Sequence, residues 1–275
     1  MPGRCDPPDR RDRTHTERRL TPMMAPMTFG LLVGGLLGLV GGGGSILAVP
    51  ALVYGVGMPL TAAIPSSLLV VGASSAVALL PRLRQGLNWT LALIIGATGG
   101  ITAYAGTLVN RMLDQRTLLV VFAAIMILAG IRMFMPTKSS TGSCYNAGRS
   151  VRWRRCLPKA LATGVVVGFL TGLLGVGGGF LIVPALTLVL GLPMALAVGT
   201  SLAIIVINSM GGFISHLGNI DVDWKNTVVF TVTAMAASLL AGRLGRSLPD
   251  KALKHGFAIL VMLVAGYVIV QAFMV

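Results

Sequence analysis

Two glycine-rich stretches carry the groups in this sequence that are best suited to binding a ligand. The first reads Gly41-Gly-Gly-Gly-Ser-Ile-Leu-Ala-Val-Pro50, and the second, 134 residues later, reads Gly175-Val-Gly-Gly-Gly-Phe-Leu-Ile-Val-Pro184. Consecutive glycines disfavour a helix, at about 1 kcal/mol each relative to alanine. A helix that starts again after such a break presents unpaired backbone N–H groups, which bind anions well. The two stretches therefore predict an anion site made largely of main-chain amides.

Polar residues at matching positions after the two stretches extend this predicted site. Ser66-Ser67 corresponds to Thr200-Ser201, and Ser74-Ser75 corresponds to Asn208-Ser209. Hydroxyls can also bond to their own helix backbone, and a buried amide can join two helices, so these alternatives stay open. The predicted substrate-binding residues are Gly42, Gly43, Gly44, Ser45, Pro50, Ser66, Ser67, Gly177, Gly178, Gly179, Pro184, Thr200, Ser201 and Asn208.

A second set of glycines is predicted to pack helices together instead of binding a ligand. Gly30, Gly34 and Gly38 stand four residues apart, and the same spacing recurs at Gly164, Gly168 and Gly172. Small residues at this spacing let two membrane helices approach closely. Packing needs spaced glycines and not consecutive ones, so the runs at 42–44 and 177–179 are better explained by a site.

Several kinds of chemistry have no residues to support them. No Asp, Glu, Lys or Arg lies in the middle of an apolar segment, so an intramembrane proton relay is not expected. No Ser-His-Asp set or metal-ligand spacing is present, and the three cysteines are expected to be reduced thiols. The sequence predicts no enzymatic activity, no cofactor and no metal.

The elements that must position the predicted site are membrane helices. Of the 275 residues 55% are hydrophobic and only 11% are charged, with a mean hydropathy of +0.85, whereas about 25% of a soluble domain is charged. Apolar runs of about 20 residues recur, as a crossing helix requires. We expect an all-α polytopic integral membrane protein with about eight transmembrane helices, arranged as two homologous four-helix halves. The first helix of each half is expected to be broken by the glycine motif.

The expected organisation has four parts. They are a basic, disordered N-terminal tail (1–26), a first transmembrane repeat (27–135), a basic cytoplasmic linker (136–159) and a second transmembrane repeat (160–275). The net charge of +14 comes from Lys and Arg between apolar runs, where they mark topology, so no nucleic-acid partner is expected.

Counting positive charges selects between two membrane layouts. Eight crossings with a cytoplasmic N-terminus place 16 Lys and Arg inside and 6 outside, as the positive-inside rule requires. A competing layout makes each glycine-broken segment re-entrant, which leaves three crossings per half and an inverted repeat. The tail and the linker, both basic, would then lie on opposite sides, so charge favours the eight-crossing layout.

At these glycine stretches the chain resembles the TauE/SafE sulfite exporter family, also called the TSUP transporters. The resemblance rests on Gly38-Leu-Val-Gly-Gly-Gly-Gly-Ser-Ile-Leu-Ala-Val-Pro50 and Gly172-Leu-Leu-Gly-Val-Gly-Gly-Gly-Phe-Leu-Ile-Val-Pro184, with Gly191-Leu-Pro193 and Ala197-Val-Gly-Thr-Ser201. It implies a multi-pass inner-membrane permease for sulfite, organosulfonates or related sulfur oxyanions. The first copy has Gly42 where the second has Val176, and Ser45 where it has Gly179, so the two half-sites are expected to be unequal.

The predicted function is secondary transport of a small anion by alternating access, with the site between the two halves. An anion channel through the same glycine stretches is one alternative, and a membrane assembly subunit without transport is another. The expected partners are the anion and the lipid bilayer. The identity of the anion, the direction of flux, any coupling ion and any homo-oligomer stay open.

Overall fold

The computed structural model of the chain describes residues 11–85, 88–110, 112, 114–135, 153–174, 179–216 and 223–274. Within them lie only helices: α1 (Arg11–Val40), α2 (Gly43–Pro50), α3 (Leu60–Leu79), α4 (Trp89–Asn110), α5 (Gln115–Phe134), α6 (Trp153–Leu174), α7 (Gly179–Leu188), α8 (Met194–His216), α9 (Trp224–Ser247) and α10 (Asp250–Met274). A π-helical turn (Ala51–Gly55) follows α2, and a 3-10 turn (Leu80–Gln85) follows α3. Seven of the described helices are long and apolar enough to cross a membrane, which confirms the all-α polytopic fold.

The first glycine-broken segment is a helical hairpin. A Cβ atom on Gly44 would lie 2.5 Å from the Val33 carbonyl oxygen, and one on Gly55 would lie 2.5 Å from the Phe29 ring. Residue numbers therefore rise along α2 and its π-helical turn while they fall along the neighbouring part of α1. The reversal begins at Gly41, whose φ of 79° is a conformation that favours glycine. The chain turns back at the break instead of continuing across.

Two pairs of helices pack through the glycines spaced four apart. Gly34 faces the backbone of Ala234 and Gly38 faces that of Ser238, so α1 runs parallel to α9. In the same way Gly168 faces Gly99, and Gly172 faces Ala103. A Cβ atom on any of these glycines of α1 or α6 would collide with backbone, which a side-chain movement cannot relieve. The predicted packing role of these glycines is confirmed.

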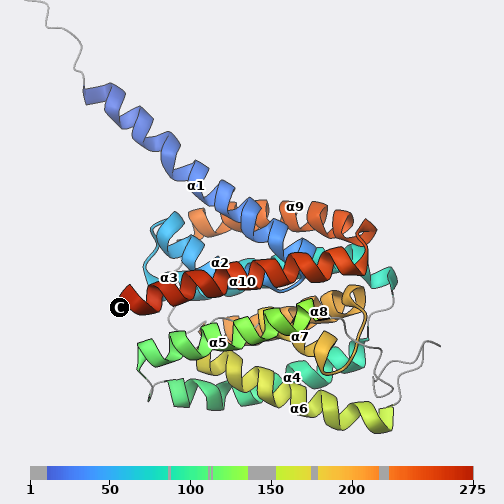
Figure 1. Cartoon of the computed structure of the whole chain (residues 1–275). Helices are drawn as coiled ribbons and strands as arrows, with labels where there is room; N and C mark the ends of the chain where they lie inside the picture. Colours follow the sequence, from blue (N-terminus) through green and yellow to red (C-terminus); the bar gives the residue numbers. More distant parts are fainter. Residues whose placement is uncertain are drawn as a thin grey trace, which may run out of the picture.

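The hairpin changes how the two parts of the chain are oriented. A broken segment that crossed once would leave the chain at the far end of the bundle, whereas the hairpin returns it toward the end where α1 begins. As a result, α1 begins at one end of the bundle and α5 ends at the other (Figure 1). The helices from α6 to α10 then run in the opposite sense to those from α1 to α5. This is the inverted arrangement that charge counting disfavoured. The start of α1 and the end of α5, which adjoin the predicted tail and linker, therefore lie at opposite ends of the bundle, not together as the eight-crossing layout expected.

We call the end of the bundle where α5 finishes and α6 starts the linker side. The Lys254 ammonium donates a hydrogen bond to the Met135 carbonyl at 3.3 Å, so the start of α10 also lies there. The basic residues between Arg243 and Lys254, which the eight-crossing layout put outside, thus share the side of the basic linker. Cys156, near the start of α6, is disulfide-bonded, which corrects the expectation of reduced thiols.

The core is built around the short helices. The first six residues of α7, Gly179 to Pro184, are all buried, and Phe180 packs edge-on against Phe122 with ring centroids 5.2 Å apart. In α2, the residues Gly43 to Ile46 are also buried. The helix α2 packs against α1, α3 and α10, and α7 packs against α5, α6 and α8, so these neighbours surround the buried first turns.

Candidate anion site and access cavity

The first turns of α2 and α7 meet at the centre of the molecule. A Cβ atom on Gly42 would touch the Gly179 carbonyl oxygen and lie 2.7 Å from its carbonyl carbon, and one on Gly179 would lie 2.7 Å from the Ser45 hydroxyl. Three of the predicted residues are thus brought together from positions more than 130 residues apart. Each helix N-terminus carries about half a positive charge, so two of them create a region of positive potential without an ionised side chain. Gly177 and Gly178 lie outside the described residues.

The three glycines that begin the first hairpin have different surroundings. Gly42 stands at the N-cap of α2, where it provides no side-chain oxygen for the first amides. Gly44 packs against α1, and a Cβ atom on Gly43 would lie 2.5 Å from the flexible end of the Leu260 side chain. Close packing therefore accounts for Gly42 and Gly44. The Ser45 amide already donates to the Gly42 carbonyl at 3.3 Å, so the Gly43 and Gly44 amides are the groups that this turn offers to a ligand.

Most predicted hydroxyls are engaged with the protein itself. Ser45 donates to the Gly42 carbonyl at 2.7 Å, and Ser67 donates to the Ile64 carbonyl at 2.7 Å. Ser201 donates to the Val198 carbonyl at 2.8 Å and also approaches the Gly41 carbonyl at 3.4 Å. Their oxygens keep lone pairs but no free proton, so these serines mainly shape the helices around the two first turns.

Thr200 differs from its counterpart in the first repeat. Ser66 accepts a hydrogen bond from Thr227 at 3.1 Å, whereas the Thr200 hydroxyl is 1% exposed and has no hydrogen-bond partner among the described residues. The repeats align Trp89 with Trp224, so the position equivalent to Thr227 is Ala92, which has no hydroxyl to donate. Thr200 is therefore a buried donor close to Ser201 and the first hairpin.

The two prolines shape the short helices and cannot donate a hydrogen bond. Pro50 ends α2, and the chain continues from it as a π-helical turn in which the Val56 N–H bonds to the Ala51 carbonyl at 3.1 Å. Pro184 is buried within α7. Both positions remove a backbone donor from a short helix, which makes their role one of helix geometry.

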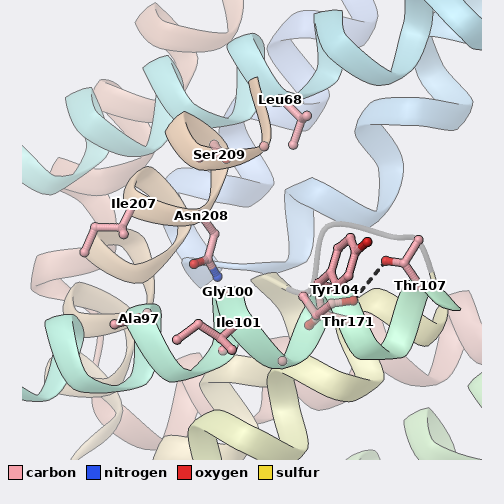
Figure 2. A pocket seen from close by; sticks show the side chains of 16 residues that line it. Leu68, Ala97, Gly100, Ile101, Tyr104, Thr107, Thr171, Ile207, Asn208 and Ser209 are labelled. Atoms are coloured by element: carbon pink, nitrogen blue, oxygen red, sulfur yellow. Dashed lines mark hydrogen bonds between the residues drawn. The ribbon is translucent and has the colours of Figure 1, made fainter. Parts of the chain in front are cut away.

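A cavity of about 610 Å³ lies beside this centre, between α3, α4, α6 and α8. Asn208 of α8 lies in it, facing Gly100 and Ile101 of α4 (Figure 2). Thr171 near the end of α6 lines the same cavity. The Ile205 side chain, less than one turn before Asn208, would lie 2.9 Å from a Cβ atom on Gly179. The helix α8 therefore contacts the cavity through Asn208 and the first turn of α7 through Ile205.

Sequence reasoning placed Asn208 at the site but did not find the cavity. The signal was the small residues in α4, where Gly96, Gly99 and Gly100 leave room, together with Gly211 and Gly212 of α8. Such glycines are indistinguishable in sequence from those that pack helices closely. Among the described residues, no group of three or more His, Cys, Asp or Glu is placed to hold a metal ion.

Arg82 is the functional candidate that the sequence analysis missed. It lies in the 3-10 turn that follows α3, yet only 2% of it is exposed. Its Nη2 donates to the carbonyls of Gly38 at 3.2 Å and Leu39 at 3.5 Å, at the C-terminal end of α1. A cation at a helix C-terminus is favourable because the carbonyl dipoles point toward it. An arginine at the edge of an apolar run is usually interfacial, which is why its burial was not expected.

The corresponding helix end in the second repeat has a neutral cap. The Asn110 Nδ2 donates to the Leu173 carbonyl at 2.6 Å, and Leu173 is the repeat counterpart of Leu39. The position equivalent to Asn110 in α9 is Gly245, where a Cβ atom would lie 2.9 Å from the Arg82 Nη2. The ends of α1 and α6 are therefore capped by different side chains, one charged and one neutral.

Comparison with known proteins agrees with this architecture. The family model described as "Sulfite exporter TauE/SafE" matches residues 27–268. A probable membrane transporter protein of Xylella fastidiosa is 32% identical over 246 residues, covering 87% of this chain and 92% of its own. The probable membrane transporter protein YunE of Bacillus subtilis is 28% identical over 265 residues, covering 89% and 96%. No solved structure matches the chain significantly. The chain is therefore a multi-pass membrane transporter that belongs to the TauE/SafE sulfite exporter family.

Proposed function

We propose that this transporter carries a small sulfur-containing oxyanion, such as sulfite or an organosulfonate, through a site where α2 and α7 begin. The observation that carries the proposal is the meeting of two helix N-termini at Gly42 and Gly179, in the buried centre of a membrane bundle. Together the two termini supply about one positive charge, which suits a monoanion such as an organosulfonate or hydrogensulfite, the singly protonated form of sulfite. The name of the matching family supports sulfite in particular.

The geometry favours a carrier over a channel. A channel needs a continuous aqueous path, whereas Gly42 and Gly179 are in backbone contact and the residues around them are buried. A carrier instead needs an arrangement that can open to either side in turn, and the oppositely directed repeats α1–α5 and α6–α10 are such an arrangement. An assembly subunit without transport would have no use for two buried helix N-termini that point at one another.

The proposal is tested with purified protein in liposomes. We expect saturable uptake of one sulfur oxyanion from a panel of sulfite, sulfate, thiosulfate, sulfoacetate, taurine and carboxylates. Taurine, which is zwitterionic, is expected to be transported poorly because it carries no net charge to match the helix termini. Counterflow, in which an internal unlabelled anion accelerates uptake of the labelled one, would distinguish a carrier from a channel. Absence of flux for every sulfur anion would refute the substrate assignment.

We also infer that the linker side faces the cytoplasm of the inner membrane. Thirteen Lys and Arg belong to segments on the linker side, against nine on the opposite side, and six of those nine lie in the first 22 residues. The bias thus matches the positive-inside rule, which weighs short loops most. This orientation places the N-terminal end outside, whereas the sequence alone predicted it in the cytoplasm.

A cysteine introduced at Met112 and another at Ser247 report this orientation. Both positions are exposed, and they lie at opposite ends of the bundle. We expect an impermeant thiol reagent to label Met112→Cys from outside and Ser247→Cys only after the cells are opened. The eight-crossing layout instead requires both to be labelled from the same side, so equal labelling would contradict the inverted arrangement.

The disulfide at Cys156 favours the opposite orientation, and the same labelling experiment tests it. A disulfide at Cys156 is favoured in an oxidising compartment, whereas the charge bias puts that end of α6 in the cytoplasm. Because charge acts directly on helix insertion, the proposed orientation follows the charge bias. Labelling of Ser247→Cys from outside and of Met112→Cys only in opened cells would reverse the orientation and leave the inverted fold intact.

A further inference from the structure

The interfaces that α3 and α8 make with their neighbours differ, although the repeats make them equivalent. On one side α3 packs against α9, and Ser238 of α9 donates to the Ser74 carbonyl of α3 at 3.0 Å, sharing its proton with the Met235 carbonyl of its own helix at 2.9 Å. Both serines are buried. On the other side α8 packs against α4 at Gly96, where an added Cβ atom would lie 3.5 Å from the Ile207 side chain, and the cavity of about 610 Å³ lies between the two helices beside that contact. One interface is closed and its counterpart is open.

A sequence difference between the repeats accounts for this asymmetry. The alignment that pairs Trp89 with Trp224 pairs Ala103 of α4 with Ser238 of α9. The same register is seen in the packing, where Gly38 faces Ser238 and Gly172 faces Ala103. Alanine cannot donate the hydrogen bond that joins α9 to α3. The α4–α8 interface therefore lacks the contact that closes the α3–α9 interface.

The open cavity is unsuited to being filled by lipid. Asn208, the repeat counterpart of Ser74, is half-buried in it and makes no hydrogen bond with the described residues. An amide facing hydrocarbon without a partner costs several kcal/mol. The adjacent Thr171, Thr107 and Ser209 add further polar atoms to the lining. Water or a polar solute must satisfy the Asn208 amide.

The α3 helix also contains buried polar groups that make no hydrogen bond with the described residues. The hydroxyls of Ser74 and Ser75 are buried and have no hydrogen-bond partner among the described residues. Buried polar groups in native proteins are nearly always satisfied. Their counterparts Asn208 and Ser209 line the open cavity, so hydration of Ser74 and Ser75 would follow if α3 and α9 separated in the same way.

The two interfaces face different sides of the membrane. The cavity extends along α4 to Thr107, near its end at Asn110, which is the side opposite the linker. Ser74 and Ser238 lie toward the ends of α3 and α9, which finish on the linker side (Figure 1). Opening of the α4–α8 interface gives access from the side opposite the linker, and opening of the α3–α9 interface gives access from the linker side.

We infer that the cavity beside Asn208 is a water-filled vestibule through which the anion reaches the first turns of α2 and α7 from the side opposite the linker. The Ser238–Ser74 contact is the matching gate on the linker side, closed in this conformation. The identity of the solute rests on the proposed function. The hydration of the cavity and the closure of the gate are independent of it.

Thiol accessibility tests the inference without measuring transport. Asn208→Cys and its counterpart Ser74→Cys are made in a background in which Cys5, Cys144 and Cys156 are replaced by alanine, and each is exposed to an anionic, membrane-impermeant thiol reagent. Met112→Cys marks the side opposite the linker. We expect Asn208→Cys to react from that side and Ser74→Cys to stay unreactive from either side. Equal rates, or no reaction of Asn208→Cys, would overturn the vestibule.

A second variant tests the gate. Ser238→Ala removes one hydrogen bond, which corresponds to a shift of about fivefold toward the open gate, so Ser74→Cys should react about fivefold faster from the linker side. Thr231→Val is the matched control, because Thr231 lies on the same helix and bonds only to its own backbone at Thr227. An unchanged rate in Ser238→Ala, or an equal increase in the control, would overturn the gate. If none of the sulfur anions is transported but the labelling results are as expected, the proposed substrate is rejected and the vestibule is retained.

Discussion

Replacing Gly42 by leucine is expected to abolish transport while the protein still inserts and folds. The new side chain would meet the carbonyl group of Gly179, with the Phe180 nitrogen only 3.2 Å from its Cβ atom. These are backbone atoms, so the first turns of α2 and α7 must move apart. A displacement of about 1 Å in positioned groups can reduce a rate by about 100-fold, and we expect a loss of that order in liposome flux.

The control for this variant lies on the same hairpin. A Cβ atom added to Gly35 in α1 would have no neighbouring heavy atom within 4 Å, so Gly35→Leu should transport normally. Gly43→Leu should be intermediate, because its Cβ atom would meet only the movable end of Leu260. Membrane yield and size-exclusion profile show whether each variant is folded. If a folded Gly42→Leu protein transports at the wild-type rate, the first turns of α2 and α7 are not part of the anion path.

Replacing Arg82 by methionine is expected to cause the largest loss of stability of any single substitution considered for this protein. The side chain is 2% exposed and donates to two carbonyls at the end of α1. Hydrogen bonds from a charged group contribute about 1.5–3 kcal/mol each, so losing both should cost about 3 kcal/mol or more. The midpoint of thermal unfolding in detergent, followed by the circular dichroism of the helices, measures the loss.

The repeat supplies a matched comparison for Arg82. Asn110→Ala removes the single neutral cap from the Leu173 carbonyl, so its cost should be about 1 kcal/mol. Arg82→Lys keeps the charge but has a single ammonium group in place of a planar fork, and should fall between the two. A thermal midpoint of Arg82→Met equal to that of Asn110→Ala would mean that the buried guanidinium does not hold the first hairpin.

The membrane fold was predictable because it depends on composition and spacing. Apolar runs of about 20 residues can only be helices in a bilayer, since every backbone group must be paired internally. Glycines four apart predicted close helix contacts, and Gly34 and Gly168 make them. The repeated glycine stretches predicted two breaks that meet, and Gly42 and Gly179 are in contact.

The direction of the chain after the first break was not predictable from the same residues. Whether a helix continues or turns back after Gly41 depends on what its next turns pack against, and here Gly44 and Gly55 pack against α1. Charge counting chose the wrong layout because it counted the broken segment as one crossing. It also gave the basic tail the same weight as the short loops.

By itself the sequence determined the helical class, the internal repeat and the meeting of two glycine breaks, because hydrophobicity, spacing and repetition are properties of the chain. Only the tertiary structure decided the hairpin, the inversion of the repeats, the burial of Arg82 and the cavity at Asn208. Each of these depends on which surfaces come together. Ser238 and Ala103 illustrate the difference, since the Ser238 hydroxyl bonds α9 to α3, whereas its counterpart Ala103 lines the cavity between α4 and α8.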